Sequence, residues 1–209
     1  MDASIQIFSI IVLIFSVVIH EVAHGYTALL FGDNTAKNMG RLTLNPIKHI
    51  HIIGSIVVPL LLLILPGGLI LGWAKPVPYN PYNLKNRKWG EFWVAFAGPL
   101  SNILIGSAFI VLIKLAPMLG LSSVFITLAF TIVLINFVLA FFNLIPIPPL
   151  DGSKILLNLL PTDKYDAVLD FMQRWGLVAV IFFVFFLWDP LFSILLKFLF
   201  IVTGISGFL

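Results

Sequence analysis

The sequence predicts an all-α membrane protein built as a polytopic bundle of helices in a lipid bilayer. Of the 209 residues, 60% are hydrophobic and only 10% are charged, whereas a typical soluble domain is about 45–50% apolar and about 25% charged. Several stretches also approach or exceed the roughly 20 apolar residues that a spanning helix needs. These observations exclude a soluble globular domain, a disordered chain and a coiled coil. The net charge of +3 is small, so no nucleic-acid partner is expected.

The spanning helices should belong to one domain that covers residues 1–209. The candidates are residues 5–31, 92–113, 124–145 and 175–209. The first is interrupted only by two histidines and a glutamate. The last is long and is broken at Asp189-Pro190, which predicts either a kinked helix or a helical hairpin.

A fifth apolar stretch, residues 52–71, is poorly suited to a spanning helix. It contains Gly54, Pro59 and the run Pro66-Gly67-Gly68. A proline inside a helix removes a hydrogen bond, and irregular backbone is tolerated at membrane depth only where protein or a wet cavity covers it. We therefore expect a re-entrant or half-spanning segment between the first and second full crossings. Residues 69–78 should follow as an extended, β-like piece, either an edge for an unwound peptide substrate or a linker.

Three ionisable residues lie inside the first candidate helix. His20, Glu21 and His24 form the pattern HExxH. Such residues are costly in a bilayer and are functional by default. Positions i and i+4 share one helical face, so both imidazoles can bind one metal ion, with Glu21 beside it as a general base. The alternative is a polar cluster that only holds helices together, but nothing structural requires two histidines and a glutamate in an otherwise apolar helix.

A catalytic zinc site has three protein ligands and one open position. The sequence has no cysteine, so the third ligand should be a histidine, an aspartate or a glutamate. The candidates are His49, His51, Glu91, Asp33, Asp151, Asp163, Asp166, Asp170 and Asp189. Asp151 follows a proline-rich run that forces extended backbone, although an aspartate there could simply cap the next helix. His49 and His51 are two residues apart, do not share a face and are expected at the membrane interface.

Three motifs occur in order between residues 20 and 152. They are His20-Glu21-Val22-Ala23-His24, Gly98-Pro99-Leu100-Ser101-Asn102, and Asn143-Leu144-Ile145-Pro146 continuing to Leu150-Asp151-Gly152. Together they resemble the motifs of the site-2 protease family of intramembrane zinc metalloproteases, in its short prokaryotic form without a PDZ or CBS domain. The resemblance implies that His20, His24 and Asp151 bind one Zn²⁺ ion and that Glu21 is the general base. It also implies regulated proteolysis of a transmembrane protein substrate.

Two asparagines in these motifs are candidates for substrate or oxyanion binding. Asn102 lies in the middle of the second candidate helix, between Gly98 and Gly106. It either serves the site or only forms a hydrogen bond across helices. Asn143 lies about one turn before the first proline of the third motif, where its side chain could donate to a substrate carbonyl as an oxyanion donor does.

The metal ligands also predict topology. His20 and His24 must meet Asp151 at one ion, and both sites lie toward the exit ends of their helices. The helices over 5–31 and 124–145 should therefore run in the same direction. Most basic residues then share one side, which the positive-inside rule makes cytoplasmic. We expect a multi-pass protein of the prokaryotic cell (inner) membrane, with its zinc site toward the cytoplasmic side.

The function predicted from the sequence is that of an intramembrane zinc endopeptidase. One alternative is a metal-binding membrane transporter or channel, and another is a non-proteolytic member of the same family. Transporters often contain two related halves, and the sequence has no visible internal repeat. The intact Glu21 argues against a non-proteolytic role. The sequence defines neither a substrate nor an oligomeric state.

Overall fold

The computed structural model describes residues 3–51 and 74–205. The predicted re-entrant segment 52–71 and the start of the predicted extended piece 69–78 lie outside those residues. Within the described ranges there are helices, turns and loops but no strand, which confirms the all-α class. In this described part of the chain, four helices are long and apolar enough to cross a bilayer. The long helical elements are α1 (Ala3–Leu30), α4 (Arg87–Leu115), α5 (Ser123–Asn143), α7 (Thr162–Phe182) and α8 (Trp188–Thr203).

Short elements occupy the connections between these long helices. They are α2 (Thr35–Asn38), the 3₁₀ turns Pro46–His49 and Pro81–Asn83, and α6 (Asp151–Leu159). Side-chain caps fix several starting points, since Asn86 accepts from the N–H of Trp89 and Ser122 accepts from the N–H of Phe125. Gly204, with φ of +75°, ends α8 in the left-handed conformation that glycine adopts easily.

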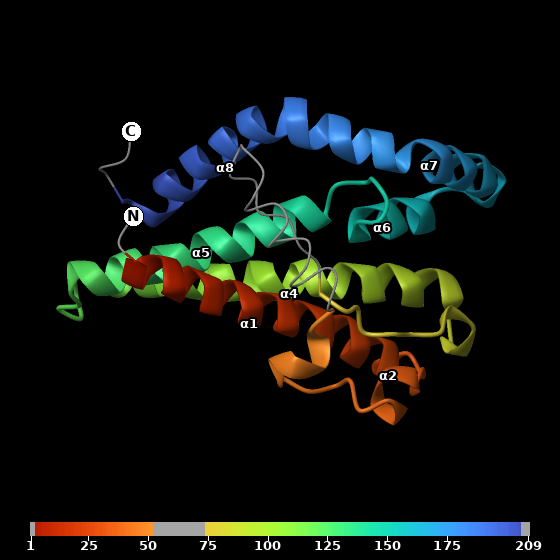
Figure 1. Ribbon diagram of the computed structural model, residues 1–209, viewed down its shortest axis with the longest axis horizontal. Coiled ribbons are helices and arrows are strands. Elements are labelled where there is room, and N and C mark those ends of the chain that lie inside the picture. Colours follow the sequence, from red (N-terminus) through yellow and green to blue (C-terminus); the bar gives the residue numbers. More distant parts are fainter. Residues whose placement is uncertain (1–2, 52–73, 206–209) are drawn as a thin grey trace.

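Helices α1, α4 and α5 form the centre of the bundle, and α4 packs against both of the others (Figure 1). Two contacts define the relative direction of α1 and α4. Ser16 on α1 meets Asn102 on α4, whereas His24 further along α1 meets Val94 earlier on α4. These two helices are therefore antiparallel. Figure 1 shows α5 turning back along α4, so that α1 and α5 run in the same direction, as the ligand positions predict.

The largest apolar cluster joins α4, α5 and α8. Its buried members are Ile110, Ile113, Ala129, Val133, Leu195 and Leu199. Gly106 on α4 lets Phe137 of α5 approach closely, because an added Cβ would lie 2.7 Å from the ring. Small residues allow such close helix contacts where lipid provides no hydrophobic drive for helices to associate.

The C-terminal part of the chain forms a single long rod. Helix α7 begins at Thr162, earlier than the apolar pattern predicts, and leads through the π-helical turn Phe183–Leu187 into α8. The break predicted at Asp189-Pro190 is thus accommodated within a continuous helix of 41 residues, Asp163–Thr203. A π-turn widens the helix by one residue directly before the proline, which then lies in the first turn of α8 where it is tolerated. The rod arches over α5 and α6 (Figure 1).

A buried carboxylate ties the end of α1 to the segment that precedes α4. Asp33, completely buried, accepts hydrogen bonds from the N–H of Asn80 at 2.7 Å and from Nδ2 of Asn83 at 2.8 Å. It also accepts from the backbone and hydroxyl of Thr35. Burial alone would raise the pKa of Asp33, but these donated bonds outweigh it and hold the pKa below its ordinary value. The carboxylate thus stays charged and fixes the loop.

Candidate metal centre

Two imidazoles and one carboxylate converge beside α4. His20 and His24 come from one face of α1, and Asp151 is the first residue of α6. Oδ2 of Asp151 lies 3.1 Å from Nε2 of His20 and 3.3 Å from Nε2 of His24. Across both described ranges, this is the one group of three or more such side chains whose ligand atoms lie within 4.8 Å of one another.

This geometry suits a tetrahedral metal ion. Two ligand atoms about 2.1 Å from a tetrahedral Zn²⁺ lie about 3.4 Å apart, close to the separations between the carboxylate oxygen and the two ring nitrogens. Two nitrogens and one oxygen also match a ligand set found in catalytic zinc sites, with the fourth position left for water or substrate. The three side chains could therefore hold one metal ion.

Both imidazoles are oriented by acceptors on α4. Nδ1 of His20 donates to Oδ1 of Asn102 at 2.6 Å, and Nδ1 of His24 donates to the carbonyl of Val94 at 2.6 Å. A hydrogen on Nδ1 leaves Nε2 as the ligand atom, and such partners commonly set ring orientation in metal sites. Helix α4 thus orients both rings through their Nδ1 atoms and leaves their Nε2 atoms facing Asp151.

Asn102 is completely buried, and its side chain is fully used in joining three helices. Its oxygen accepts from His20, and its Nδ2 donates to the carbonyl of Ser16 at 3.3 Å and to Oδ1 of Asn136 at 2.9 Å. Asn136 in turn donates to the carbonyl of Ile132. The structure therefore places Asn102 behind a candidate ligand, with both amide hydrogens engaged. Sequence reasoning missed Asn136, although a lone amide in an otherwise apolar stretch was an available signal.

Gly98 leaves the space in front of the two histidines open. A Cβ at this position would lie 2.5 Å from Nε2 of His20 and would also contact Nε2 of His24. Those are the two atoms that face Asp151, so a single methyl group on α4 would enter the space that a metal ion would occupy. This close approach accounts for the glycine of the second motif.

A backbone contact sets the position of Asp151. A Cβ on Gly152 would collide with the carbonyl oxygens of Leu144 and Ile145, so glycine lets α6 begin directly against the end of α5. The turn at Gly152 thus presents Oδ2 of Asp151 to the two ring nitrogens, and a carboxylate binds metal in its deprotonated form.

The side chain of Glu21, on α1, is hydrogen-bonded to the segment that precedes α4. Its Oε2 accepts a hydrogen bond of 2.8 Å from the main-chain N–H of Val77. Sequence reasoning missed this contact, because a main-chain donor 56 residues away leaves no mark on side-chain spacing.

Nδ2 of Asn143 donates one hydrogen to the carbonyl of Leu139 within its own helix, and its role at the site remains a prediction. Among the residues that the structure describes, the other candidate ligands do not join the group formed by His20, His24 and Asp151. His49 is buried and its Nε2 bonds to the carbonyl of Thr43. Glu91 pairs with Arg87 at 3.1 Å on α4.

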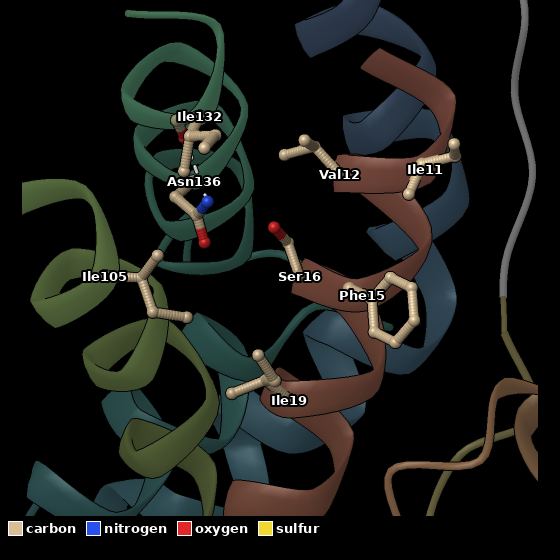
Figure 2. Close-up of a pocket in the computed structure, with 8 residues that line it drawn as sticks. All are labelled: Ile11, Val12, Phe15, Ser16, Ile19, Ile105, Ile132 and Asn136. Carbon is tan, nitrogen blue, oxygen red and sulfur yellow. Dashed lines mark hydrogen bonds between the residues drawn. The ribbon is translucent and has the colours of Figure 1, made fainter. Parts of the chain in front are cut away.

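A small apolar cavity lies between α1, α4 and α5 (Figure 2). It has a volume of about 190 Å³. Its lining residues are Ile11, Val12, Phe15, Ser16, Ile19, Ile105, Ile132 and Asn136. Ser16 and Asn136, its two polar members, are the residues that Asn102 contacts. The cavity therefore borders the hydrogen-bond network of His20 and not the three candidate ligands themselves.

Comparison with known proteins identifies the family. The model of peptidase family M50 matches residues 8–120 and 116–187. The chain belongs to peptidase family M50. This membership, together with four helices long enough to cross a bilayer, makes the chain an integral membrane protein. No solved structure shows significant similarity to it.

Three relatives illustrate the similarity. The "Putative zinc metalloprotease YwhC" of Bacillus subtilis is 43% identical over 164 residues, which cover 76% of this chain and 71% of the relative. The "Putative zinc metalloprotease Rip2" of Mycolicibacterium smegmatis is 28% identical, over 79% of this chain and 62% of the relative. The "Zinc metalloprotease MJ0392" of Methanocaldococcus jannaschii is 31% identical, over 74% of this chain and 34% of the relative.

The first prediction concerns the open space at Gly98. The variant Gly98→Ala should bind Zn²⁺ at least about tenfold more weakly, because its methyl group meets both Nε2 atoms. Titration of the purified protein against a competing chelator measures this affinity. Gly176→Ala is the control, since a Cβ there makes only ordinary contacts of 3.4 Å with Pro148. Unchanged affinity in Gly98→Ala would contradict the placement of the ion.

The second prediction concerns Asn102. Asn102→Ala leaves Nδ1 of His20 without its acceptor, so Zn²⁺ affinity should fall by about 10–100-fold. The same chelator titration applies. Asn143→Ala is the matched control, because that amide bonds only to a carbonyl of its own helix and should leave zinc affinity unchanged. Equal affinities in the two variants would remove Asn102 from the support of the metal centre.

Proposed function

We propose that this M50 peptidase is an intramembrane zinc endopeptidase that cleaves peptide bonds within or near transmembrane segments of other membrane proteins. One observation carries the proposal. The three candidate ligands meet at His20, and α1 continues for ten residues beyond it to Leu30. At 1.5 Å per residue that is about 15 Å from the end of a helix long enough to span the bilayer. A site at that depth suits substrates that are themselves in the membrane.

The proposed ligands are His20, His24 and Asp151, holding one Zn²⁺ ion. When bound, zinc supplies Lewis-acid polarisation of the scissile carbonyl and lowers the pKa of a water molecule. The relatives described as zinc metalloproteases support the choice of metal. The two nitrogens and one oxygen of the ligand group support it independently.

Glu21 is the proposed general base. It lies on α1 between the two histidines, and its Oε2 accepts a hydrogen bond from the N–H of Val77. In the reaction, Glu21 takes a proton from the attacking water while the water oxygen adds to the peptide carbonyl carbon. It then delivers a proton to the amide nitrogen as the C–N bond breaks. The products are a carboxylate end and an amine end.

The substrate must present an unwound peptide. Within a helix, the carbonyl of each residue is already hydrogen-bonded and is shielded by its side chains. A transmembrane substrate therefore has to open locally before its carbonyl can reach a buried centre, and helix-breaking residues near the cleavage point should help. Asn143 remains our candidate donor to the developing oxyanion.

We also propose that the metal centre faces the cytoplasmic side of a prokaryotic cell membrane. Helices α2 and α6 and the start of α7 lie together at one end of the bundle (Figure 1). Basic residues gather in the connections at this end, among them Lys37, Arg41, Lys85, Lys88 and Lys154. The loop of residues 116–123 at the other end has no charge. By the positive-inside rule the basic end is cytoplasmic.

The third prediction tests the enzyme activity. In cells that carry Glu21→Gln, fragments of membrane proteins that accumulate with the wild-type chain should disappear, because an amide cannot accept the proton. Quantitative proteomics of fragments ending in or near transmembrane segments measures this. Glu91→Gln is the matched control, since Glu91 pairs with Arg87 on α4. A Glu21→Gln protein that still produced the fragments would defeat the assignment.

The fourth prediction tests the orientation. The sequence has no cysteine, so single cysteines can be labelled without background. Met118→Cys, which replaces an exposed residue after α4, should react with a membrane-impermeant thiol reagent in intact cells. Asp166→Cys, at an exposed position near the start of α7, should react only after the membrane is opened. The reverse pattern would invert the proposed topology.

A further inference from the structure

The segment over residues 75–80 crosses α1 at Glu21 and is anchored on both sides of that crossing. Before the crossing, the N–H of Lys75 donates to the carbonyl of His49 at 2.8 Å. At the crossing, the N–H of Val77 donates to Oε2 of Glu21 at 2.8 Å. After it, the N–H of Asn80 donates to the buried carboxylate of Asp33 at 2.7 Å. The segment therefore has a fixed register against α1.

Val77 supplies the one main-chain donor over residues 76–78. Pro76 and Pro78 flank it, and proline has no N–H. The side chain of Val77 is 5% exposed and packs on Gly25, one turn after Glu21. A Cβ on Gly25 would lie 2.7 Å from Cγ1 of Val77. The missing side chain on α1 thus allows the segment to approach closely enough for the hydrogen bond to Glu21.

Arg41 binds the carbonyl oxygen of the peptide group between Pro76 and Val77, whose N–H binds Glu21. Its Nη2 donates to the carbonyls of Lys75 at 2.9 Å and of Pro76 at 3.3 Å, and the side chain is 6% exposed. The carbonyl of Pro76 and the N–H of Val77 belong to one planar unit. Fixing the oxygen on one edge therefore directs the N–H on the opposite edge. A buried guanidinium whose hydrogen bonds go to main-chain carbonyls suits this purpose.

We infer that Val77 and Arg41 are positioning residues for the general base. The peptide group between Pro76 and Val77 holds Oε2 of Glu21 and leaves Oε1 for the attacking water. The inference rests on the proposed role of Glu21. The carbonyls of residues 75 and 76 and the N–H of Val77 already have partners. These three groups support Glu21 and are not free to bond to a substrate strand.

Replacing Val77 by its 2-hydroxy acid analogue tests the inference, since the resulting ester keeps the side chain, removes the N–H and leaves the Pro76 carbonyl in place as a weaker acceptor for Arg41. Suppression of a stop codon during cell-free synthesis into lipid nanodiscs produces the variant. We expect kcat on a membrane substrate to fall roughly tenfold or more, with KM and bound zinc unchanged. The matched control is the 2-hydroxy acid analogue of Lys75, which loses a bond to His49 and not to Glu21. Its kcat should stay within about threefold of wild type.

Arg41 offers a second test by rescue. Arg41→Ala should lower kcat. Arg41→Lys should recover most of it, because one nitrogen, Nη2, serves both carbonyls and the lysine ammonium has three N–H donors. A purely structural role would instead lower the amount of folded protein and leave kcat per folded, zinc-bound molecule unchanged. A Val77 ester with wild-type kcat, or an Arg41→Ala protein with wild-type kcat, would overturn the inference.

Hydrogen exchange provides a readout that needs no activity. Because Pro76 and Pro78 carry no amide hydrogen, fragments over 75–78 report on Lys75 and Val77 alone. In Glu21→Ala, exchange at Val77 should accelerate by roughly tenfold or more, while Lys75 keeps its rate. Equal exchange at Val77 in both proteins would overturn the contact. Wild-type protein without cleavage, or Glu21→Gln with full cleavage, would instead refute the proposed function while the exchange result still judged the geometry.

Discussion

Two imidazoles and a carboxylate have to reach one point inside a bundle that is otherwise apolar. Each is polar, and a buried polar group without a partner is costly, so the surrounding helices must supply partners as well as space. Helix α4 does both. Oδ1 of Asn102 and the carbonyl oxygen of Val94 accept hydrogen bonds from the Nδ1 atoms of His20 and His24. Gly98 lies between these two acceptors on α4 and has no side chain to fill the space where the Nε2 atoms face Asp151. The spacing of these three positions on α4 follows from the spacing of His20 and His24 on the antiparallel α1.

The network extends beyond the site because each partner must itself be satisfied. The amide of Asn102 reaches Ser16 on α1 and Asn136 on α5, and Asn136 bonds within its own helix. Hydrogen bonds across helices in lipid contribute only modestly to stability. Here these bonds matter for orientation, because they fix how α1, α4 and α5 are rotated about their axes relative to one another. That rotation brings the loop after α5, and with it Asp151, to the two histidines.

Most of the metal group could be predicted from the local spacing of residues and from the motifs. His20, Glu21 and His24 follow from a four-residue period on one helix, and Asp151 follows from the resemblance of its proline-rich motif. The described structure brings His20, His24 and Asp151 together. The helices were foreseen because apolar length is a local property, but the start of α7 was not, since its first turns are polar and continue the helix beyond the apolar stretch. Val77 could not be found in the same way, because its contact joins distant parts of the chain through a main-chain group. The amide of Asn136 stands out in an apolar stretch, but its partner on α4 cannot be read from local spacing.

Because prolines flank Val77 on both sides, the hydrogen bond to Glu21 depends on the register of their segment against α1. Along extended backbone, a shift of one residue moves the chain by about 3.3 Å. Either such shift would bring a pyrrolidine ring, which has no hydrogen to donate, to the oxygen of Glu21. A one-residue sliding error in this stretch therefore leaves the carboxylate with no substitute donor. The nearest alternative donors, the N–H groups of Lys75 and Tyr79, lie two residues away, about 7 Å along the chain.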